Sequence, residues 1–271
     1  MKRILVPVDF SKEAENAAQV AVSIAKKCDG TVYFLHMLEL PETTEFMISN
    51  QIEPTFFMEM AKRRFETFLK LPFLKSVKVQ TNILFYKAFN GIQDEAKALN
   101  IDLIVMGSKG ASGLAEVIIG SNTEKVVRNA DVPVLVIKET PKNFEIKHLV
   151  FASDFSLTGR KSFQKVIDFA NFFEARIHLL YVNTIHNFET TEESSQHIHD
   201  FIKGFIFYNY LITIYNANSV EKGILDFSKS IKADAIALNT SGRGGLSKLF
   251  NGSIAAEIAN HAILPVVTFK L

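Results

Sequence analysis

The sequence contains a single cysteine, Cys28, among its 271 residues. One cysteine excludes an intramolecular disulfide and suits a reducing compartment, so we expect a cytoplasmic protein. Long apolar runs are absent as well. The run that follows Lys2 and Arg3 ends at Asp9, which is shorter than the roughly 7–15 apolar residues of a signal peptide. No stretch approaches the ~20 apolar residues of a membrane-spanning helix, so no membrane partner is expected.

An excess of charge of one sign is also missing. The formal net charge is +1, with 22% charged and 48% hydrophobic residues. This balance is typical of a globular protein and excludes a general affinity for nucleic acid or anionic membranes. Three enzyme motifs are absent: the G-x-x-x-x-G-K-[ST] phosphate loop, the G-x-G-x-x-G fingerprint and the G-x-S-x-G elbow. No cysteines and histidines cluster at zinc spacing, and His197 and His199 should point to different faces of a helix, so no metal site is expected.

What the sequence does contain is an internal repeat. Aligned without gaps, the stretch 102–138 matches the stretch 234–270 at 11 of 37 positions. Upstream, VDFS at 8–11 corresponds to SDFS at 153–156. The matches stay in register through an apolar run, a glycine-rich loop and a helical pattern, so they indicate a duplication. We expect two domains, residues 1–140 and 145–271, each large enough to bury its own core.

Within each copy, continuous apolar runs alternate with helical patterns. The runs are typical of strands buried on both faces, and the helical patterns repeat apolar residues at i, i+3, i+4 and i+7. The expected strands cover 2–8, 31–38, 77–85, 102–106 and 132–138, and then 148–152, 177–182, 209–216, 234–239 and 265–269. Helices are expected between them, the second one shorter in the second copy. This pattern predicts two tandem open parallel five-stranded sheets with helices on both faces and right-handed crossovers.

Two of the expected strand ends carry residues suited to ligand binding. Open parallel sheets bind ligands beyond the carboxyl ends of their strands, where the strand order reverses. Pro7, Val8 and Asp9 close the first strand, and Met106 and Gly107 close the fourth. If the strand order is 3-2-1-4-5, these two strands are neighbours and both ends face one crevice. We therefore expect a ligand in that crevice.

The loop that follows the fourth strand is rich in glycine. Gly107, Gly110 and Gly120 are expected to let the backbone adopt positive φ and approach a bulky anion. Main-chain N–H groups and the helix that starts at Ser121 would hold this anion. Each charge-assisted hydrogen bond of this kind contributes roughly 1.5–3 kcal/mol. Several of them can hold a polyphosphate without a lysine.

The spacing G-x2-G-x9-G-[ST] after an apolar strand, together with VPVDFS near the start of the chain, resembles the ATP-binding class of universal stress protein (UspA-like) domains. The resemblance covers both halves. It implies an adenine nucleotide alpha hydrolase-like α/β fold with strand order 3-2-1-4-5. It also implies a bound adenine nucleotide, ATP or a relative of it, with or without Mg²⁺.

The resemblance also assigns places to the parts of the nucleotide. The adenine and ribose would lie near Pro7, Asp9 and the end of the second strand at Met37, and the phosphates would lie on the glycine loop. No residue is expected to be catalytic. The residues that would form the binding site are Pro7, Val8, Asp9, Met37, Met106, Gly107, Gly110, Gly120, Ser121 and Asn122.

Simpler structural roles compete for several of these residues. Ser121 and Glu124 have the S-x-x-E spacing of a capping box, a role that can coexist with a phosphate contact. Asp9 precedes a helix and can favour the helix dipole, but the recurrence of this acid as Asp154 favours a place in the pocket. His36 lies in an expected strand and is interpreted as a packed residue.

The second copy departs from this pattern. Asn239 stands where the first copy has Gly107, and Ala152 stands where it has Pro7. Asparagine tolerates a left-handed backbone, but its side chain is expected to fill the space where the backbone should approach the ligand. We therefore predict that the second site binds nucleotide weakly or not at all.

The fifth strands are expected at the edges of their sheets. Val132–Lys138 and Leu264–Lys270 are apolar, and bare apolar edges invite pairing or aggregation. The simplest solution is that these two segments pair with each other across a pseudo-twofold axis. The chain would then imitate the pairing of two domains through the fifth strand that the resemblance implies. A homodimer of whole chains remains compatible with the sequence.

Three functions are compatible with these features. The first is a cytosolic nucleotide-binding regulator of the stress response, with at most slow ATP hydrolysis, because no well-placed general base or arginine finger is evident. The second is a non-catalytic protein-interaction module with vestigial nucleotide sites, which Asn239 favours in the second copy. The third is an adenylating enzyme, which ranks last because S-G-G-x-D-S does not follow the first strand.

Overall fold

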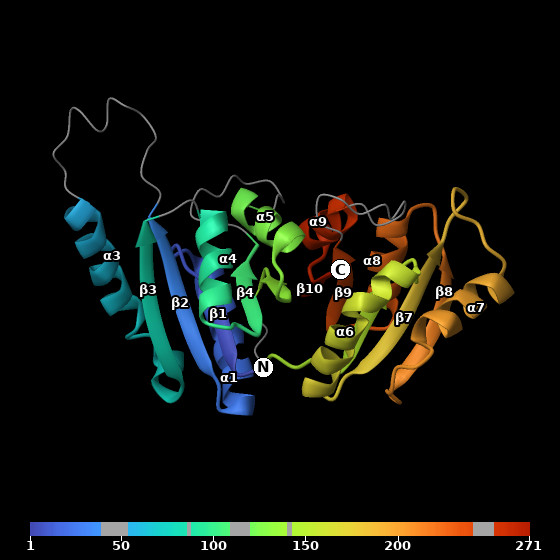
Figure 1. Cartoon of the computed structure of the whole chain (residues 1–271), viewed down its shortest axis with the longest axis horizontal. Coiled ribbons are helices and arrows are strands. Elements are labelled where there is room, and N and C mark those ends of the chain that lie inside the picture. Colours follow the sequence, from blue (N-terminus) through green and yellow to red (C-terminus); the bar gives the residue numbers. More distant parts are fainter. Residues whose placement is uncertain (39–53, 86–87, 109–119, 140–142, 241–251) are drawn as a thin grey trace, which may run out of the picture.

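The computed structural model describes residues 1–38, 54–85, 88–108, 120–139, 143–240 and 252–271, in which strands and helices alternate (Figure 1). The first half contains β1 (Arg3–Pro7), α1 (Lys12–Cys28), β2 (Thr31–Leu38), α3 (Pro54–Phe68), η1 (Pro72–Ser76), β3 (Lys78–Phe85), α4 (Ala88–Ala98), β4 (Leu103–Gly107), α5 (Ser121–Asn129) and β5 (Val134–Ile137). The second half contains β6 (His148–Ala152), η2 (Leu157–Gly159), α6 (Arg160–Phe172), β7 (Arg176–Asn183), α7 (Thr191–Ile202), β8 (Tyr210–Asn216), α8 (Val220–Ser230), β9 (Ala235–Thr240), α9 (Gly252–His261) and β10 (Val266–Lys270).

The described strands form one ten-stranded sheet in the order β3-β2-β1-β4-β5-β10-β9-β6-β7-β8. Read from its outer edge, each half has the strand order 3-2-1-4-5, which confirms the predicted α/β fold. All pairs within a half are parallel. β5 and β10 are antiparallel neighbours, with Leu135 opposite Val267. The two sheets that the sequence suggested are therefore continuous.

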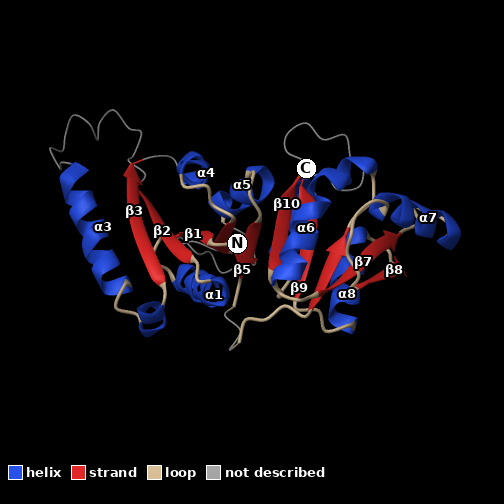
Figure 2. Cartoon of the chain, turned by 60° about the horizontal axis from the view of Figure 1, so that its bottom comes forward, coloured by secondary structure: helices blue, strands red, loops and turns tan. Residues whose placement is uncertain are grey.

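Helices cover both faces of this sheet (Figure 2). On one face, α1, α3, α6 and α7 pack on an apolar core that continues through both halves. On the other face, α4 and α5 cover the first half, and α8 and α9 cover the second. Because strands buried on both faces need apolar residues at every position, this arrangement explains the continuous apolar runs in the sequence. In the part of the chain that is described, no helix is long and apolar enough to cross a membrane.

Two lysines bridge the junction between the halves in a reciprocal way. Lys270, at the end of β10, donates a hydrogen bond to the Asn129 carbonyl at the end of α5 (3.1 Å) and pairs with Asp131 (2.7 Å). Lys138, its counterpart after β5, donates to the Asn260 carbonyl near the end of α9. Cations stabilise the carbonyl end of a helix because the helix dipole is negative there. Each half therefore caps a helix of the other half, and α5 and α9 lie against each other.

The two halves fill their cores differently. Alignment of VDFS with SDFS places Phe163 of α6 at the position of Ala18 in α1. Phe163 is fully buried, and its ring lies 4.9–5.4 Å from four other phenyl rings, those of Phe151, Phe201, Phe205 and Phe207. Helix α7 thereby packs on α6 through aromatic rings. As the sequence predicted, α7 (12 residues) is shorter than its counterpart α3 (15 residues).

A pair of histidines joins β6 to β7 in the second half. His148 Nδ1 lies 3.1 Å from His178 Nε2, and His178 is buried. One imidazole must donate and the other must accept, so this hydrogen bond requires a neutral ring. Burial lowers the pKa of His178, and the neighbouring His148 and Arg176 lower it further. A second proton on the pair would place two positive charges against each other in the core.

This pair predicts acid sensitivity. Below about pH 6.5, the ordinary pKa of histidine, the unfolded chain binds a proton at His178 that the folded state resists. The free energy of unfolding should therefore fall as the pH falls below that value. His178→Leu should lose less stability than the wild type between about pH 7.5 and about pH 5.5 in urea titrations. The exposed His199→Gln serves as the control. An unchanged pH dependence in His178→Leu would contradict this role.

Candidate functional site

The end of β1 forms a tight turn that fixes the Asp9 carboxylate. Asp9 Oδ1 accepts hydrogen bonds from the Ser11 N–H (3.0 Å) and the Ser11 hydroxyl (2.5 Å). The Ser11 oxygen in turn accepts from the Ala14 N–H and caps α1. Between them, Phe10 has a φ of 65°, an uncommon conformation for a bulky residue. Phe155 repeats it in the second half, with a φ of 51°. The turn therefore holds the acid at the head of α1.

Gly107 is the last residue of β4, which lies next to β1. The reason for a glycine at this position is not the positive φ that the sequence suggested. Its backbone does not adopt positive φ, which corrects the sequence interpretation. A Cβ at this position would lie 2.8 Å from the carbonyl carbon and oxygen of Glu13. Glycine is thus required because the first turn of α1 crosses directly over the end of β4. This close approach brings the Asp9 turn to the end of β4.

The far end of the glycine loop is also in an ordinary conformation. Gly120 has φ −57° and ψ 142°, so the expectation of positive φ is wrong here too. Its N–H donates to the Ser108 carbonyl (2.9 Å), which closes the base of the loop and leaves this amide unavailable to an anion. Gly110, the remaining glycine of the predicted site, lies outside the described residues. An anion at this end of the loop would therefore need amides other than that of Gly120.

The first turn of α5 offers such amides. Ser121 is the first residue of the helix, and the N-cap is Gly120, which has no side chain to cap it. The predicted capping box of Ser121 and Glu124 is therefore not formed, and Glu124 pairs with Arg128 instead (2.8 Å). Amides in the first turn of a helix have no intrahelical acceptor. The Ser121 side chain is exposed and the Asn122 side chain is half-buried.

Thr123, which the sequence did not single out, anchors this helix to the strand. It is buried, and its hydroxyl donates to the Gly107 carbonyl (3.0 Å). The hydrogen bond fixes the start of α5 beside the end of β4. The sequence offered little indication of this contact, because threonine is common in the first turn of a helix and no neighbouring residue identifies the acceptor of its hydroxyl.

The other predicted residues lie around the ends of β1, β2 and β4. Val8 and Met106 are buried, with 4% and 5% of their surface exposed, so neither presents its side chain to a ligand. Pro7 and Met37 are half-buried. His36 is packed, as expected: its Nδ1 lies 2.7 Å from the Val8 carbonyl and its ring lies against that of Phe10. Burial lowers the pKa of His36.

In the second half, Asn239 takes the place of Gly107 and changes the neighbouring helix. Its side chain is buried and accepts a hydrogen bond from the Ser162 hydroxyl (2.9 Å). It also lies against Gly159. The side chain thus points toward the start of α6, which corrects the expectation that it fills the ligand space. To make room, α6 begins at Arg160 after the turn η2, whereas α1 begins directly after Ser11.

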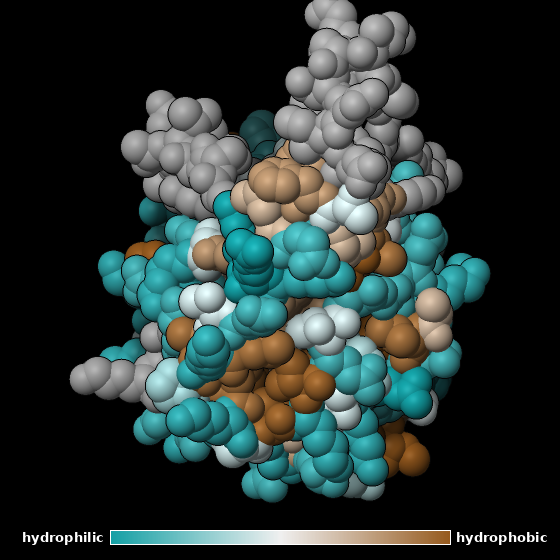
Figure 3. All heavy atoms as spheres, turned by 90° about the vertical axis from the view of Figure 1, so that its left-hand side faces the viewer, coloured by the Kyte–Doolittle hydropathy of each residue, from teal (hydrophilic) through white to brown (hydrophobic). Residues whose placement is uncertain are grey.

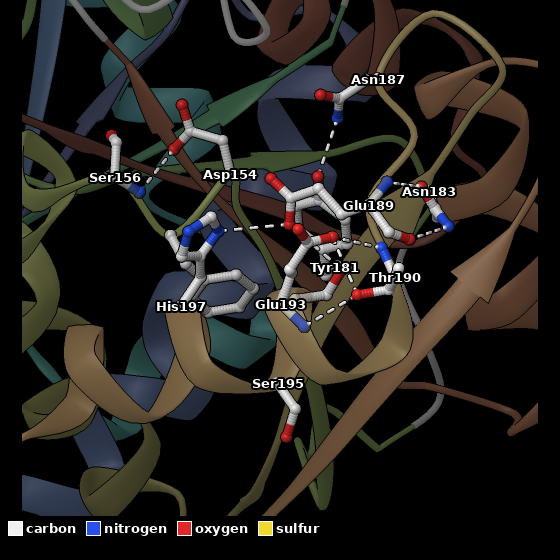
Figure 4. A network of polar contacts seen from close by, with 12 residues as sticks. Asp154, Ser156, Tyr181, Asn183, Asn187, Glu189, Thr190, Glu193, Ser195 and His197 are labelled. Carbon is white, nitrogen blue, oxygen red and sulfur yellow. Dashed lines mark hydrogen bonds and ion pairs between the residues drawn. The ribbon is translucent and has the colours of Figure 1, made fainter.

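A polar network occupies the corresponding corner of the second half (Figure 4). Asp154 accepts from the Ser156 N–H (3.1 Å), and His197 from α7 points toward Glu189 (3.2 Å). Tyr181, at the position of His36, receives a hydrogen bond from the Asn187 side chain (3.1 Å). Burial, together with the negative charge of Glu189, raises the pKa of Tyr181 to about 12. Within the described ranges, no group of three or more histidine, cysteine or acidic residues is placed to hold a metal ion.

Comparisons with known proteins agree with this architecture. The sequence profile described as "Universal stress protein family" matches residues 1–138 and 213–270. A universal stress protein of Methanocaldococcus jannaschii is 31% identical over 147 residues, which is 52% of this chain and 84% of that protein. The crystal structure of a universal stress protein from Archaeoglobus fulgidus superposes with a TM-score of 0.74 at 20% identity, covering 99% of this chain and 96% of that one. This last likeness concerns the fold alone.

Proposed function

The chain belongs to the universal stress protein family, and we propose that its first half binds ATP or a related adenine nucleotide where β1, β2 and β4 end. One observation carries the proposal. β1 and β4 are parallel neighbours at the point where the strand order reverses, so the Asp9 turn and the start of α5 lie at the same end of the sheet, where open parallel sheets bind ligands.

The residues around this crevice fit the parts of a nucleotide. The first turn of α5 has amides without intrahelical acceptors, a positive dipole end and an N-cap without a side chain, all of which favour phosphate. Ser121 and Asn122 lie in this turn. The Asp9 carboxylate, held in place by Ser11, suits the ribose hydroxyls as an acceptor. Met37 and Pro7 would contact the adenine, and Gly110, which lies outside the described residues, would contact the phosphates.

The nucleotide contacts can be tested with a matched pair of variants. Ser121→Glu places a carboxylate where the phosphates would lie, and glutamate suits the first turn of a helix, so the fold should persist. Loss of charge-assisted hydrogen bonds should weaken ATP binding by roughly 10–150-fold in isothermal titration. Ser253→Glu makes the same change at the aligned position of the second half and should leave the affinity unchanged. Wild-type affinity in Ser121→Glu would refute the assignment.

The proposal includes an asymmetry between the halves, taken as domains 1–140 and 145–271. The second half binds nucleotide weakly or not at all, because α6 starts later and Asn239 has taken over the contact with it. Pairing of β5 with β10 takes the place of the pairing of two chains. Bound nucleotide then acts as a signal in the stress response of the cytosol. A chain that does not bind added ATP would favour the alternative, a protein-interaction module.

A further inference from the structure

A concave surface lies on the face of the sheet that α1 and α3 cover. It is a groove with a volume of about 930 Å³ between the first turn of α1 and the last turns of α3. It shares the turn 9–11 with the proposed nucleotide crevice but opens between the two helices. Its apolar residues are Phe10, Phe68 and Leu71, and its charged residues besides Asp9 are Glu13 and Glu15 on α1 and Arg63 and Arg64 on α3.

The groove therefore has walls of opposite charge around an aromatic floor. Glu13 and Glu15 belong to the first turn of α1, and Glu15 pairs with Lys12 on its own helix (3.0 Å). On the opposite wall, the Arg64 guanidinium lies 5.9 Å from the centre of the Phe10 ring. A ligand that satisfies both walls must carry a positive group and a negative group.

The second half shows what fits at the acidic end. Arg160 of α6 occupies the position that Glu15 has in α1. Its guanidinium donates to the carbonyls of Asp200 (2.6 Å), Phe201 (2.7 Å) and Lys203 (2.6 Å) at the end of α7. It also lies 5.0 Å from the centre of the Phe205 ring. A guanidinium thus bridges the start of the first helix and the end of the second, where the helix dipole is negative.

In the first half, the same position carries an acid instead of that internal cation. Glu15 cannot bridge to the carbonyl end of α3, because both are negative, so the gap between the helices stays open. The acids of α1, the end of α3 and the Phe68 ring favour a planar cation supplied from outside. Arg63 and Arg64 favour a carboxylate nearby, since arginine binds carboxylates through paired hydrogen bonds.

We propose that this groove binds a ligand with a guanidinium at one end and a carboxylate at the other, the chemistry of free arginine or of a C-terminal arginine residue. The guanidinium takes the place that the Arg160 side chain has in the second half, and the carboxylate lies at Arg63 and Arg64. The groove shares Asp9 and Ser11 with the proposed nucleotide site, so its ligand is measured without ATP.

Four probes test the ligand chemistry by isothermal titration on the full chain. L-arginine should bind. L-citrulline, which has the same shape without the charge, and agmatine, which lacks the carboxylate, should each bind at least about tenfold more weakly. The peptide Gly-Gly-Arg distinguishes the two sources: tighter binding than L-arginine indicates a peptide terminus, and weaker or equal binding indicates the free amino acid. Absence of L-arginine binding, or equal binding of L-citrulline, would overturn the proposal.

Variants of Glu15 test the location. Glu15→Arg should supply the internal guanidinium of the second half, abolish L-arginine binding and raise the midpoint of thermal unfolding. Glu15→Gln removes the charge without closing the groove and should weaken binding while leaving the midpoint nearly unchanged. Glu257→Arg, the same change at an exposed position on α9, should affect neither. L-arginine binding that survives Glu15→Arg, with Glu257→Arg behaving as the wild type, would place any site elsewhere and refute this one.

Discussion

Gly107→Ala should destabilise the first half by about 3 kcal/mol, the upper end of the range for overpacked interiors. The added Cβ would lie 2.8 Å from the carbonyl carbon and oxygen of Glu13 and 2.9 Å from its Cβ. Two of these are backbone atoms of a helix, which cannot rotate away as a side chain can. The first turn of α1 must move, and with it the Asp9 turn. Urea unfolding followed by circular dichroism measures the loss, and nucleotide affinity should fall in the same variant.

Two further variants show whether the close approach is the cause. Gly120→Ala, at a glycine whose φ of −57° and ψ of 142° accept a side chain, should change stability by no more than about 1 kcal/mol. Asn239→Gly, the reverse change in the second half, should cost about 1–2 kcal/mol, because it leaves the buried Ser162 hydroxyl without its amide partner. If Gly107→Ala proved as stable as Gly120→Ala, the packing of α1 on β4 would not be the reason for the glycine.

Phe163→Ala should cost about 3–5 kcal/mol, the usual range for a buried phenyl ring. The ring is fully buried and touches four others, so its removal leaves a cavity that rigid aromatic neighbours fill poorly. Because these neighbours join α6 to α7, the loss should be local. Hydrogen exchange should report faster opening in α6 and α7 than in α1 and α3.

The control for this loss is a phenyl ring that packs on little. Phe188 is 73% exposed, and Phe188→Ala should change stability by less than about 0.5 kcal/mol. The first half has Ala18 at the position of Phe163, so the fold itself does not require an aromatic ring there. The cost of Phe163→Ala arises because the neighbouring core residues of the second half are packed around the ring. Equal effects of Phe163→Ala and Phe188→Ala would show that the aromatic cluster does not hold α7 to α6.

The hydrophobic pattern was sufficient to predict the positions of the strands, because burial of a strand on both faces requires apolar residues next to one another in the sequence. β2 and β6 have the predicted bounds, since each is a continuous apolar run. Parallel pairing followed from the alternation of strands and helices, whereas the strand order 3-2-1-4-5 followed from the resemblance to universal stress proteins. Helix starts were harder to predict: a capping box would make Ser121 the N-cap, but α5 begins at Ser121, one residue earlier, and no periodicity distinguishes these alternatives.

The sequence suggested which residues form the candidate site, but it did not reveal why these residue types are needed there. Gly107 is glycine because α1 crosses β4, a contact between residues far apart in the chain that local spacing cannot reveal. The direction of the Asn239 side chain depends in the same way on Ser162 and Gly159. The aligned repeats show that Arg160 stands where the first half has Glu15. That Arg160 bridges two helices became clear only from its hydrogen bonds to the carbonyls at the end of α7.

The antiparallel contact of β5 with β10 uses up the inner edges of both halves, which leaves β3 and β8 as the outer strands of the described sheet. Exposed apolar residues such as Phe56, Met60 and Phe85 lie near the β3 end, which Figure 3 views face-on. The β3 end and the β8 end of the sheet differ in sequence, so the two ends of the molecule are not equivalent. Symmetric partners that join by strand addition must therefore pair β3 with β3 or β8 with β8, because a twofold axis brings the same surface of each chain together.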